Sequence, residues 1–221
     1  MYGAGNLREM VLAQLRSQIV SGEAAPGKIY SVPALAAQMN VSTTPVREAL
    51  LELSRTGMVS PLRNRGFQVE ALTPEELENQ FDVRIMVEAG ALAAVARRGL
   101  TDTQPLIKLA DAVATAVEEG DVARYIDADH AFHEALVARA NNPTLTRLVM
   151  TLRADMRLFG ISSPEGKARQ QASVAEHYEM IELAVAGDSD ALAALITRHI
   201  EAWKPLFIAA LAELSGARKI N

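Results

Sequence analysis

The sequence predicts a mainly α-helical protein in which a winged helix-turn-helix domain precedes an all-α domain built as a six-helix bundle. Three observations predict this fold class. Aromatic residues make up only 5% of the 221 residues while alanine and leucine abound, a composition that favours helices over a β-sandwich. Apolar residues recur at helical spacing along most of the chain. Hairpin signals stop near residue 72, where long helical patterns begin, so we expect domains at 1–72 and 73–221.

Composition limits the class of protein. With 49% hydrophobic and 22% charged residues, the chain is typical of a soluble globular protein with a substantial core. No apolar run is long enough for a transmembrane helix, and the N-terminus shows no apolar segment of the kind expected in a signal peptide. The absence of cysteine excludes disulfides and thiolate metal sites. We therefore expect a cytoplasmic protein that makes no use of a membrane.

The net charge of −5 is divided unevenly between the two expected domains. Residues 1–72 contain seven Lys/Arg and five Asp/Glu, whereas residues 73–221 contain fifteen and twenty-two. The first domain is therefore at +2 and the second at −7. This asymmetry places the basic surface in the N-terminal domain and suggests that the two domains have different partners.

Two helices are expected before residue 41. Residues 7–21 carry apolar side chains at i, i+4 spacing, as in an amphipathic helix. A shorter helix is expected at 31–40, with Ser31 as its N-cap and Asn40 suited to the left-handed position at its end. A single residue, Val41, then leads to the next helix, which makes the connection a tight helix-turn-helix.

The stretch VSTTPVREALLELSRTG, Val41–Gly57, predicts the recognition helix of that motif. With Ser42 as N-cap, Pro45 falls in the first turn, where its missing N–H breaks no intrahelical hydrogen bond. The expected buried stripe consists of Val46, Ala49, Leu50 and Leu53. The outward face of the N-terminal end consists of Ser42, Thr43, Thr44 and Arg47.

Two short extended runs, 58–62 and 66–72, follow this helix and predict a β-hairpin, the wing. Hydroxyls and free N–H groups at a helix start bind phosphate, and Arg47 can hold guanine through two hydrogen bonds. Arg63, Arg65 and Gly66 lie at the tip of the wing, from which the arginines can reach phosphates or the minor groove. The alternative is a small helical domain with a solvated charged face. The combination of elements favours DNA binding.

The second domain reads as helix throughout, with Gly, Asn and Pro residues between the segments. The expected helices are 73–99, 102–119, 121–140, 143–160, 164–186 and 188–214.

Three histidines of this domain occupy positions on apolar helix faces. His133 lies one turn from Asp129 on one helix, while His177 and His199 lie on two later helices. Each histidine alone is most simply a hydrogen-bonded core residue. Together they place three imidazoles and a carboxylate on inward faces, where burial without a shared partner is costly. One divalent transition metal per chain removes that cost, and three N and one O ligands suit Zn²⁺, Ni²⁺, Mn²⁺ or Fe²⁺.

Arg84 interrupts an apolar helical stripe and has two interpretations. Its guanidinium can bind a carboxylate through two hydrogen bonds. Alternatively, it forms an ion pair with Glu88 one turn later. Arg153 and Arg157 are weaker candidates for binding the same carboxylate.

The sequence VSTTPVREALLELSRTGMV, followed by RGFQV, resembles the winged-helix domain of the GntR family of bacterial transcription regulators. The helical half is similar to the FCD domain of the FadR subfamily. The family usually has arginine at the position of Thr43 and often a charged residue at that of Pro33, so a different operator preference is expected. The resemblance implies that Asp129, His133, His177 and His199 are metal ligands and that Arg84 receives an anionic effector. It also implies a homodimer on a palindromic operator.

The leading hypothesis is a transcriptional regulator, more specifically a repressor, whose affinity for DNA is controlled by a small organic acid at the metal site. An alternative is a metal sensor in which the ion is the signal. A His/Asp metalloenzyme is the third hypothesis. It is disfavoured because no further Glu or His stands out as a general base and a hydrolase has no use for a winged helix. We therefore expect no enzymatic activity.

Overall fold

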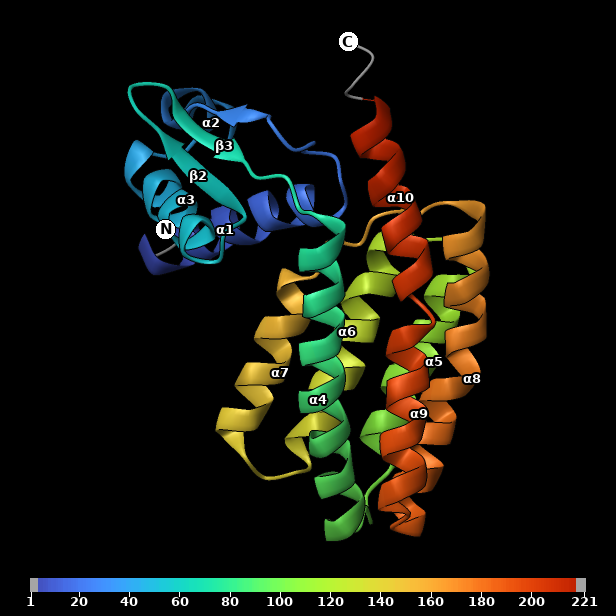
Figure 1. Cartoon of the computed structure of the whole chain (residues 1–221). Coiled ribbons are helices and arrows are strands. Elements are labelled where there is room, and N and C mark those ends of the chain that lie inside the picture. Colours follow the sequence, from blue (N-terminus) through green and yellow to red (C-terminus); the bar gives the residue numbers. More distant parts are fainter. Residues whose placement is uncertain (1–3, 218–221) are drawn as a thin grey trace. The chain divides into compact units, whose positions relative to one another are not determined.

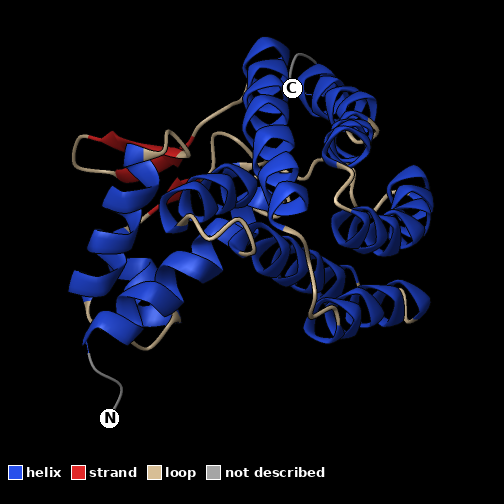
Figure 2. Cartoon of the chain, turned by 90° about the horizontal axis from the view of Figure 1, so that it is seen from below, coloured by secondary structure: helices blue, strands red, loops and turns tan. Residues whose placement is uncertain are grey.

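The computed structural model describes residues 4–217 and confirms the mainly helical fold class. The chain forms two compact units, one of residues up to Thr73 with Arg157–Phe159, the other of Pro74–Met156 and the residues from Gly160 onward. Residues 1–3 and 218–221, the outer ends of the two expected domains, lie outside the described residues. Figure 2 shows strands in the N-terminal unit, whereas the other unit is drawn as helices and loops.

The N-terminal unit contains three helices and a three-stranded antiparallel sheet of order β1-β3-β2 (Figure 1). Asn40 adopts the left-handed backbone expected of it, with φ of 53°, and the following residues connect the second helix to the third. The short strand β1 was not expected, because two residues are too few to show a period of two. The elements are α1 (Ala4–Val20), β1 (Ile29–Tyr30), α2 (Val32–Gln38), α3 (Thr43–Arg55), β2 (Val59–Leu62) and β3 (Gly66–Val69).

The third helix, α3, packs as its sequence predicts. Ser42 occupies the N-cap position with an extended backbone, and Pro45 is buried in the first turn. The Ser42 side chain makes no capping hydrogen bond, so its hydroxyl stays exposed rather than closing the helix end. The predicted stripe of apolar side chains is fully buried and consists of Val46, Ala49, Leu50 and Leu53.

The wing is a hairpin of β2 and β3 in which Leu62 pairs with Gly66. The turn closes through a hydrogen bond from the Arg65 N–H to the Leu62 carbonyl at 3.1 Å. Gly66 has φ of +114°, and a Cβ there would collide with the carbonyl oxygen of Tyr30 in β1. Only glycine fits this position, because it tolerates positive φ and lets the two backbones approach closely.

Two of the helices expected in the helical unit differ from those that the structure shows. The helix expected at 188–214 is divided at Ala202–Trp203, because Pro205 has no N–H to donate to the preceding turn. The helix expected at 143–160 ends at Asp155, after which Met156 becomes extended. The helices are α4 (Pro74–Arg98), α5 (Gln104–Glu118), α6 (Val122–Ala138), α7 (Pro143–Asp155), α8 (Pro164–Ala186), α9 (Ser189–Glu201) and α10 (Lys204–Ala217).

Helix ends in this unit are set by polar caps and the interior by apolar side chains. Asp121, Asn142, Ser163 and Asp188 accept hydrogen bonds from backbone N–H groups at the starts of α6, α7, α8 and α9, a contribution of about 1 kcal/mol each. Helix α4 packs against α6, α7, α8, α9 and α10. Among the described residues, no helix combines the length and the hydropathy that crossing a lipid bilayer requires.

Candidate metal and effector site

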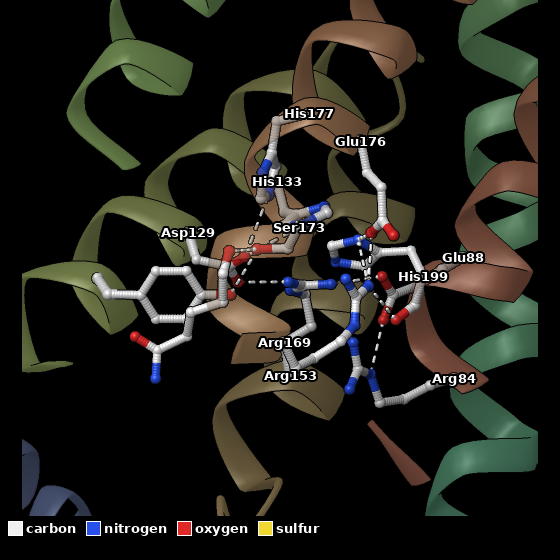
Figure 3. Close-up of polar contacts among 12 residues, drawn as sticks. Arg84, Glu88, Asp129, His133, Arg153, Arg169, Ser173, Glu176, His177 and His199 are labelled. Carbon is white, nitrogen blue, oxygen red and sulfur yellow. Dashed lines mark hydrogen bonds and ion pairs between the residues drawn. The ribbon is translucent and has the colours of Figure 1, made fainter. Parts of the chain in front are cut away.

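The four expected metal ligands converge in the interior of the helical unit. Asp129 and His133 lie one turn apart on α6, His177 lies on α8 and His199 on α9. One donor atom from each of these four side chains lies within 4.8 Å of the others. Figure 3 shows this cluster with the charged side chains that surround it.

The three imidazoles form a nearly equilateral triangle. Their ring centroids are 5.2 Å apart for His133–His177, 5.2 Å for His133–His199 and 5.3 Å for His177–His199. Their exposed fractions are 0%, 0% and 2% for His133, His177 and His199. The ring of Phe132 packs edge-on against His133 and His177 at 5.4 and 4.6 Å and covers one side of the cluster.

Several imidazole nitrogens of the cluster have no hydrogen-bond partner in the part of the chain that the structure describes. Both ring nitrogens of His133 and Nδ1 of His177 are buried and unsatisfied. His177 Nε2 lies 3.2 Å from Asp129 Oδ1, while His133 Nε2 lies 3.6 Å from the same oxygen, too far for a hydrogen bond. An unsatisfied buried polar group costs about 1–3 kcal/mol, and a bound cation removes that cost. The donor set therefore fits a transition metal of the Zn²⁺ type.

The ionisation states suit metal binding. Burial lowers the pKa of His133 well below its usual value and that of His199 to about 4, so both rings are neutral. Burial alone would raise the pKa of Asp129, but the neighbouring His133 and Arg153 lower it well below the usual value. Neutral imidazole and carboxylate are the forms that bind metals. A metal ion would therefore meet little competition from protons for these side chains at neutral pH.

A chain of buried and partly buried ion pairs leads from Asp129 to Arg84. Arg153 donates from Nη2 to Asp129 Oδ2 and from Nη1 to Glu88 Oε2, both at 2.7 Å. Arg84 Nε donates to Glu88 Oε1 at 2.8 Å. Burial would raise the pKa of Glu88, but Arg84 and Arg153 lower it to about 2. Asp129 is thus held through one oxygen by Arg153 and offers the other to the histidines.

Arg84 makes the ion pair that was one of its two expected roles. Its two terminal nitrogens, Nη1 and Nη2, make no hydrogen bond to the residues that the structure describes, so two donors remain for a carboxylate. Arg153 joins the cluster, whereas Arg157 belongs to the other unit, where its Nη1 donates to the carbonyl of Glu70.

Sequence reasoning missed a second group of polar residues on α8. Arg169 donates to Glu176 Oε2 at 2.5 Å, and the same oxygen lies 2.6 Å from His199 Nδ1. Burial would raise the pKa of Glu176, but its hydrogen bonds to His199 and Arg169 lower it to about 2. The signal was a polar stripe inside a buried helix face, at the helical positions Arg169, Ser173 and His177.

The residues expected to contact DNA lie in two places of the N-terminal unit. Arg63 and Arg65 are exposed in the wing turn, and Gly66 is half-buried at its end. At the start of α3 the exposed residues are Ser42, Thr43, Thr44 and Arg47. The unit thus offers hydroxyls and guanidinium groups from a helix start and from a hairpin.

Comparison with known proteins matches both units. The gntR family of bacterial regulatory proteins matches residues 7–69, and the FCD domain family matches residues 79–202. The gluconate operon transcriptional repressor of Bacillus licheniformis is 28% identical over 162 residues, which cover 73% of this chain and 66% of the relative. The HTH-type transcriptional regulator McbR of Escherichia coli (strain K12) is 30% identical over 158 residues, covering 69% and 72%.

A solved structure shows the same fold. The structure of E. coli McbR/YncC superposes with a TM-score of 0.78 at 24% identity and covers 100% of both chains. Both units thus match the parts of a known class of regulator. The chain belongs to the GntR family of bacterial regulatory proteins and is a transcriptional regulator with an FCD domain.

Proposed function

We propose that the protein is a DNA-binding repressor of the FadR subfamily whose operator affinity is controlled by a small carboxylate effector at a metal site. The observation that carries this proposal is the meeting of Asp129 and three buried histidines in the same chain as a winged helix. A role as repressor rather than activator is supported by the relative from B. licheniformis, which is a repressor. With this action on DNA, the proposed location is the cytoplasm.

The proposed cofactor is one divalent transition metal per chain, Zn²⁺, Ni²⁺, Mn²⁺ or Fe²⁺. Asp129, His133, His177 and His199 would hold it, because the three histidines are buried, Asp129 is partly buried, and one donor atom of each lies close to those of the others. When bound, the ion supplies positive charge and open coordination positions for an effector oxygen. The four ligand residues determine where in the helical unit that positive charge lies.

The charges around the cluster support an anionic effector. Arg84, Arg153 and Arg169 balance three carboxylates, those of Glu88, Asp129 and Glu176. Since the charges already balance, a divalent ion adds two positive charges to a buried site. Uncompensated buried charge is costly, and an effector carboxylate offsets it. Arg84, with two terminal nitrogens available, is the proposed effector-binding residue.

The proposed assembly is a homodimer on a palindromic operator, because two recognition helices must reach half-sites about one helical turn apart. Exposed apolar side chains on two packed helices of the helical unit suit such an interface. Val83 and Met86 on α4 are 44% and 75% exposed, and Leu148 on α7 is 47% exposed.

A metal sensor is the second candidate, because the same four ligands would serve if the ion were the signal. The two candidate functions differ in whether the bound ion exchanges with metal in solution. A structural ion survives dialysis and leaves operator affinity independent of free metal, whereas a regulatory ion exchanges and shifts the DNA-binding curve. We propose no catalytic role, since the relatives are transcriptional regulators.

Replacing Arg47 by alanine tests the DNA-binding half of this proposal. We expect the affinity for an operator, selected from random DNA with the wild-type protein, to fall by about 1–3 kcal/mol, roughly 5- to 150-fold. The reason is the loss of an exposed guanidinium at the N-terminal end of α3. Fluorescence anisotropy with labelled DNA measures the loss.

Arg55→Ala is the matched control, because Arg55 lies at the other end of α3 and pairs with Glu52 at 2.7 Å. This control should bind the operator within about twofold of wild type, as surface substitutions away from special features do. Equal affinities of wild type and Arg47→Ala would show that the start of α3 does not read DNA.

A further inference from the structure

His199 differs from the other two histidines of the cluster in having a carboxylate partner outside it. Glu176 Oε2 lies 2.6 Å from His199 Nδ1, whereas among the described residues neither nitrogen of His133 and not Nδ1 of His177 has a hydrogen-bond partner. Glu176 precedes His177 on α8 and is not one of the four clustered donors. It therefore touches the site through one histidine only (Figure 3).

The contact fixes which nitrogen of His199 carries the hydrogen. Nδ1 has two neighbours, Glu176 Oε2 at 2.6 Å and Arg169 Nη2 at 3.5 Å. An ionised carboxylate only accepts hydrogen bonds and a guanidinium only donates. Because the contact with Glu176 is the shorter of the two, it determines the tautomer: Nδ1 carries the hydrogen and donates it to Glu176. The lone pair of the neutral ring is then on Nε2, which is the atom left to bind a metal.

Arg169 holds this carboxylate in place. Its Nη2 donates to Glu176 Oε2 at 2.5 Å and to the backbone carbonyl of His199 at 3.2 Å. The guanidinium also lies over the ring of Trp203, 5.5 Å from the centroid. The same arginine therefore contacts the carboxylate, the backbone of the ligand residue and Trp203, which lies between α9 and α10.

We propose that Glu176, held by Arg169, is the positioning residue that sets the tautomer and ring orientation of His199 as a metal ligand. This inference rests on the metal site of the proposed function and adds to it a residue that does not touch the ion. Metal-ligating histidines commonly donate their other N–H to a carboxylate, and loss of that partner lowers metal affinity about 10- to 100-fold.

The test measures Co²⁺ binding by the full-length protein after removal of metal with a chelator, using the visible absorption of the bound ion. We expect Glu176→Met, which removes the acceptor at similar volume, to raise the Co²⁺ dissociation constant about 10- to 100-fold. Glu176→Gln keeps a carbonyl acceptor and should lose less than Glu176→Met. The visible spectrum should shift in both variants, which a purely structural role would not cause.

Glu179→Met is the matched control, because Glu179 lies on the same helix and its ion pair with Arg198 at 4.0 Å lies on the exposed surface. It should bind Co²⁺ with wild-type affinity and spectrum. Urea unfolding of the metal-free proteins checks folding, and Glu176→Gln decides the question if Glu176→Met does not fold.

Wild-type affinity and spectrum in the decisive Glu176 variant, with stoichiometric Co²⁺ in the wild type, would overturn the positioning role alone. A wild-type protein that binds no Co²⁺ would overturn the metal site of the proposed function as well, so the two failures are distinguishable.

Discussion

The His133→Leu variant is expected to be more stable than wild type without metal and less stable with it. Both nitrogens of His133 are buried without a hydrogen-bond partner among residues 4–217, and the side chain is 0% exposed. Leucine has a similar volume and no polar atom, so it removes a penalty of about 1–3 kcal/mol in the metal-free protein. The same change deletes a metal ligand. Wild type should gain about 4 kcal/mol at a metal concentration 1,000-fold above the dissociation constant, a gain that the variant should largely lose.

Urea unfolding with chelator and with Zn²⁺ measures both differences. His130→Leu is the control, since His130 neighbours Asp129 in sequence but does not belong to the four clustered donors. The control should keep the stabilisation by Zn²⁺. An identical gain with Zn²⁺ in wild type and His133→Leu would contradict the assignment of His133 as a ligand.

The Glu88→Gln variant is expected to lose about 3–5 kcal/mol of unfolding free energy, because removal of one member of a buried ion pair leaves an uncompensated charge. Glu88 is 1% exposed and its two oxygens bind Arg84 and Arg153. The amide keeps the shape but removes the charge that both arginines need. Chemical denaturation at neutral pH, followed by circular dichroism, measures the loss.

Two further variants separate this buried pair from ordinary ion pairs. Asp82→Asn on the same helix breaks an exposed contact to Lys204 at 3.3 Å and should cost at most about 1 kcal/mol. The double variant Arg84→Met/Glu88→Met removes one charge of each sign and leaves Arg153 with Asp129, so it should recover much of the loss. A Glu88→Gln variant as stable as Asp82→Asn would refute the buried network.

The parts of the fold that follow from local periodicity were predictable from sequence. Val46, Ala49, Leu50 and Leu53 stand on one helical stripe, and all four are buried. The division of 188–214 into α9 and α10 was missed, although Pro205 was visible, because apolar periodicity continues across the break. Strand β1 was missed because it exists only through its pairing with β3.

The site was predictable where spacing decides which face a residue occupies. Asp129 and His133 are four apart, and each lies on an inward face in an amphipathic context, so their meeting could be anticipated. The contacts of Glu176 and Arg169 could not. They depend on how α8 and α9 pack, and Glu176 by itself resembles any solvated glutamate. The two roles expected of Arg84 remained open because sequence cannot tell how many of its nitrogens Glu88 occupies.

The most direct test of the central claim measures operator affinity of the full-length protein by fluorescence anisotropy. Metal-loaded and chelator-treated protein are each titrated with and without a panel of small mono-, di- and tricarboxylates. We predict that at least one carboxylate weakens DNA binding of the metal-loaded protein by about 5- to 150-fold, a coupling of about 1–3 kcal/mol, and that the Arg84→Met variant responds less. Operator affinity that no carboxylate changes, or that changes equally without metal, would contradict control of DNA binding through this site.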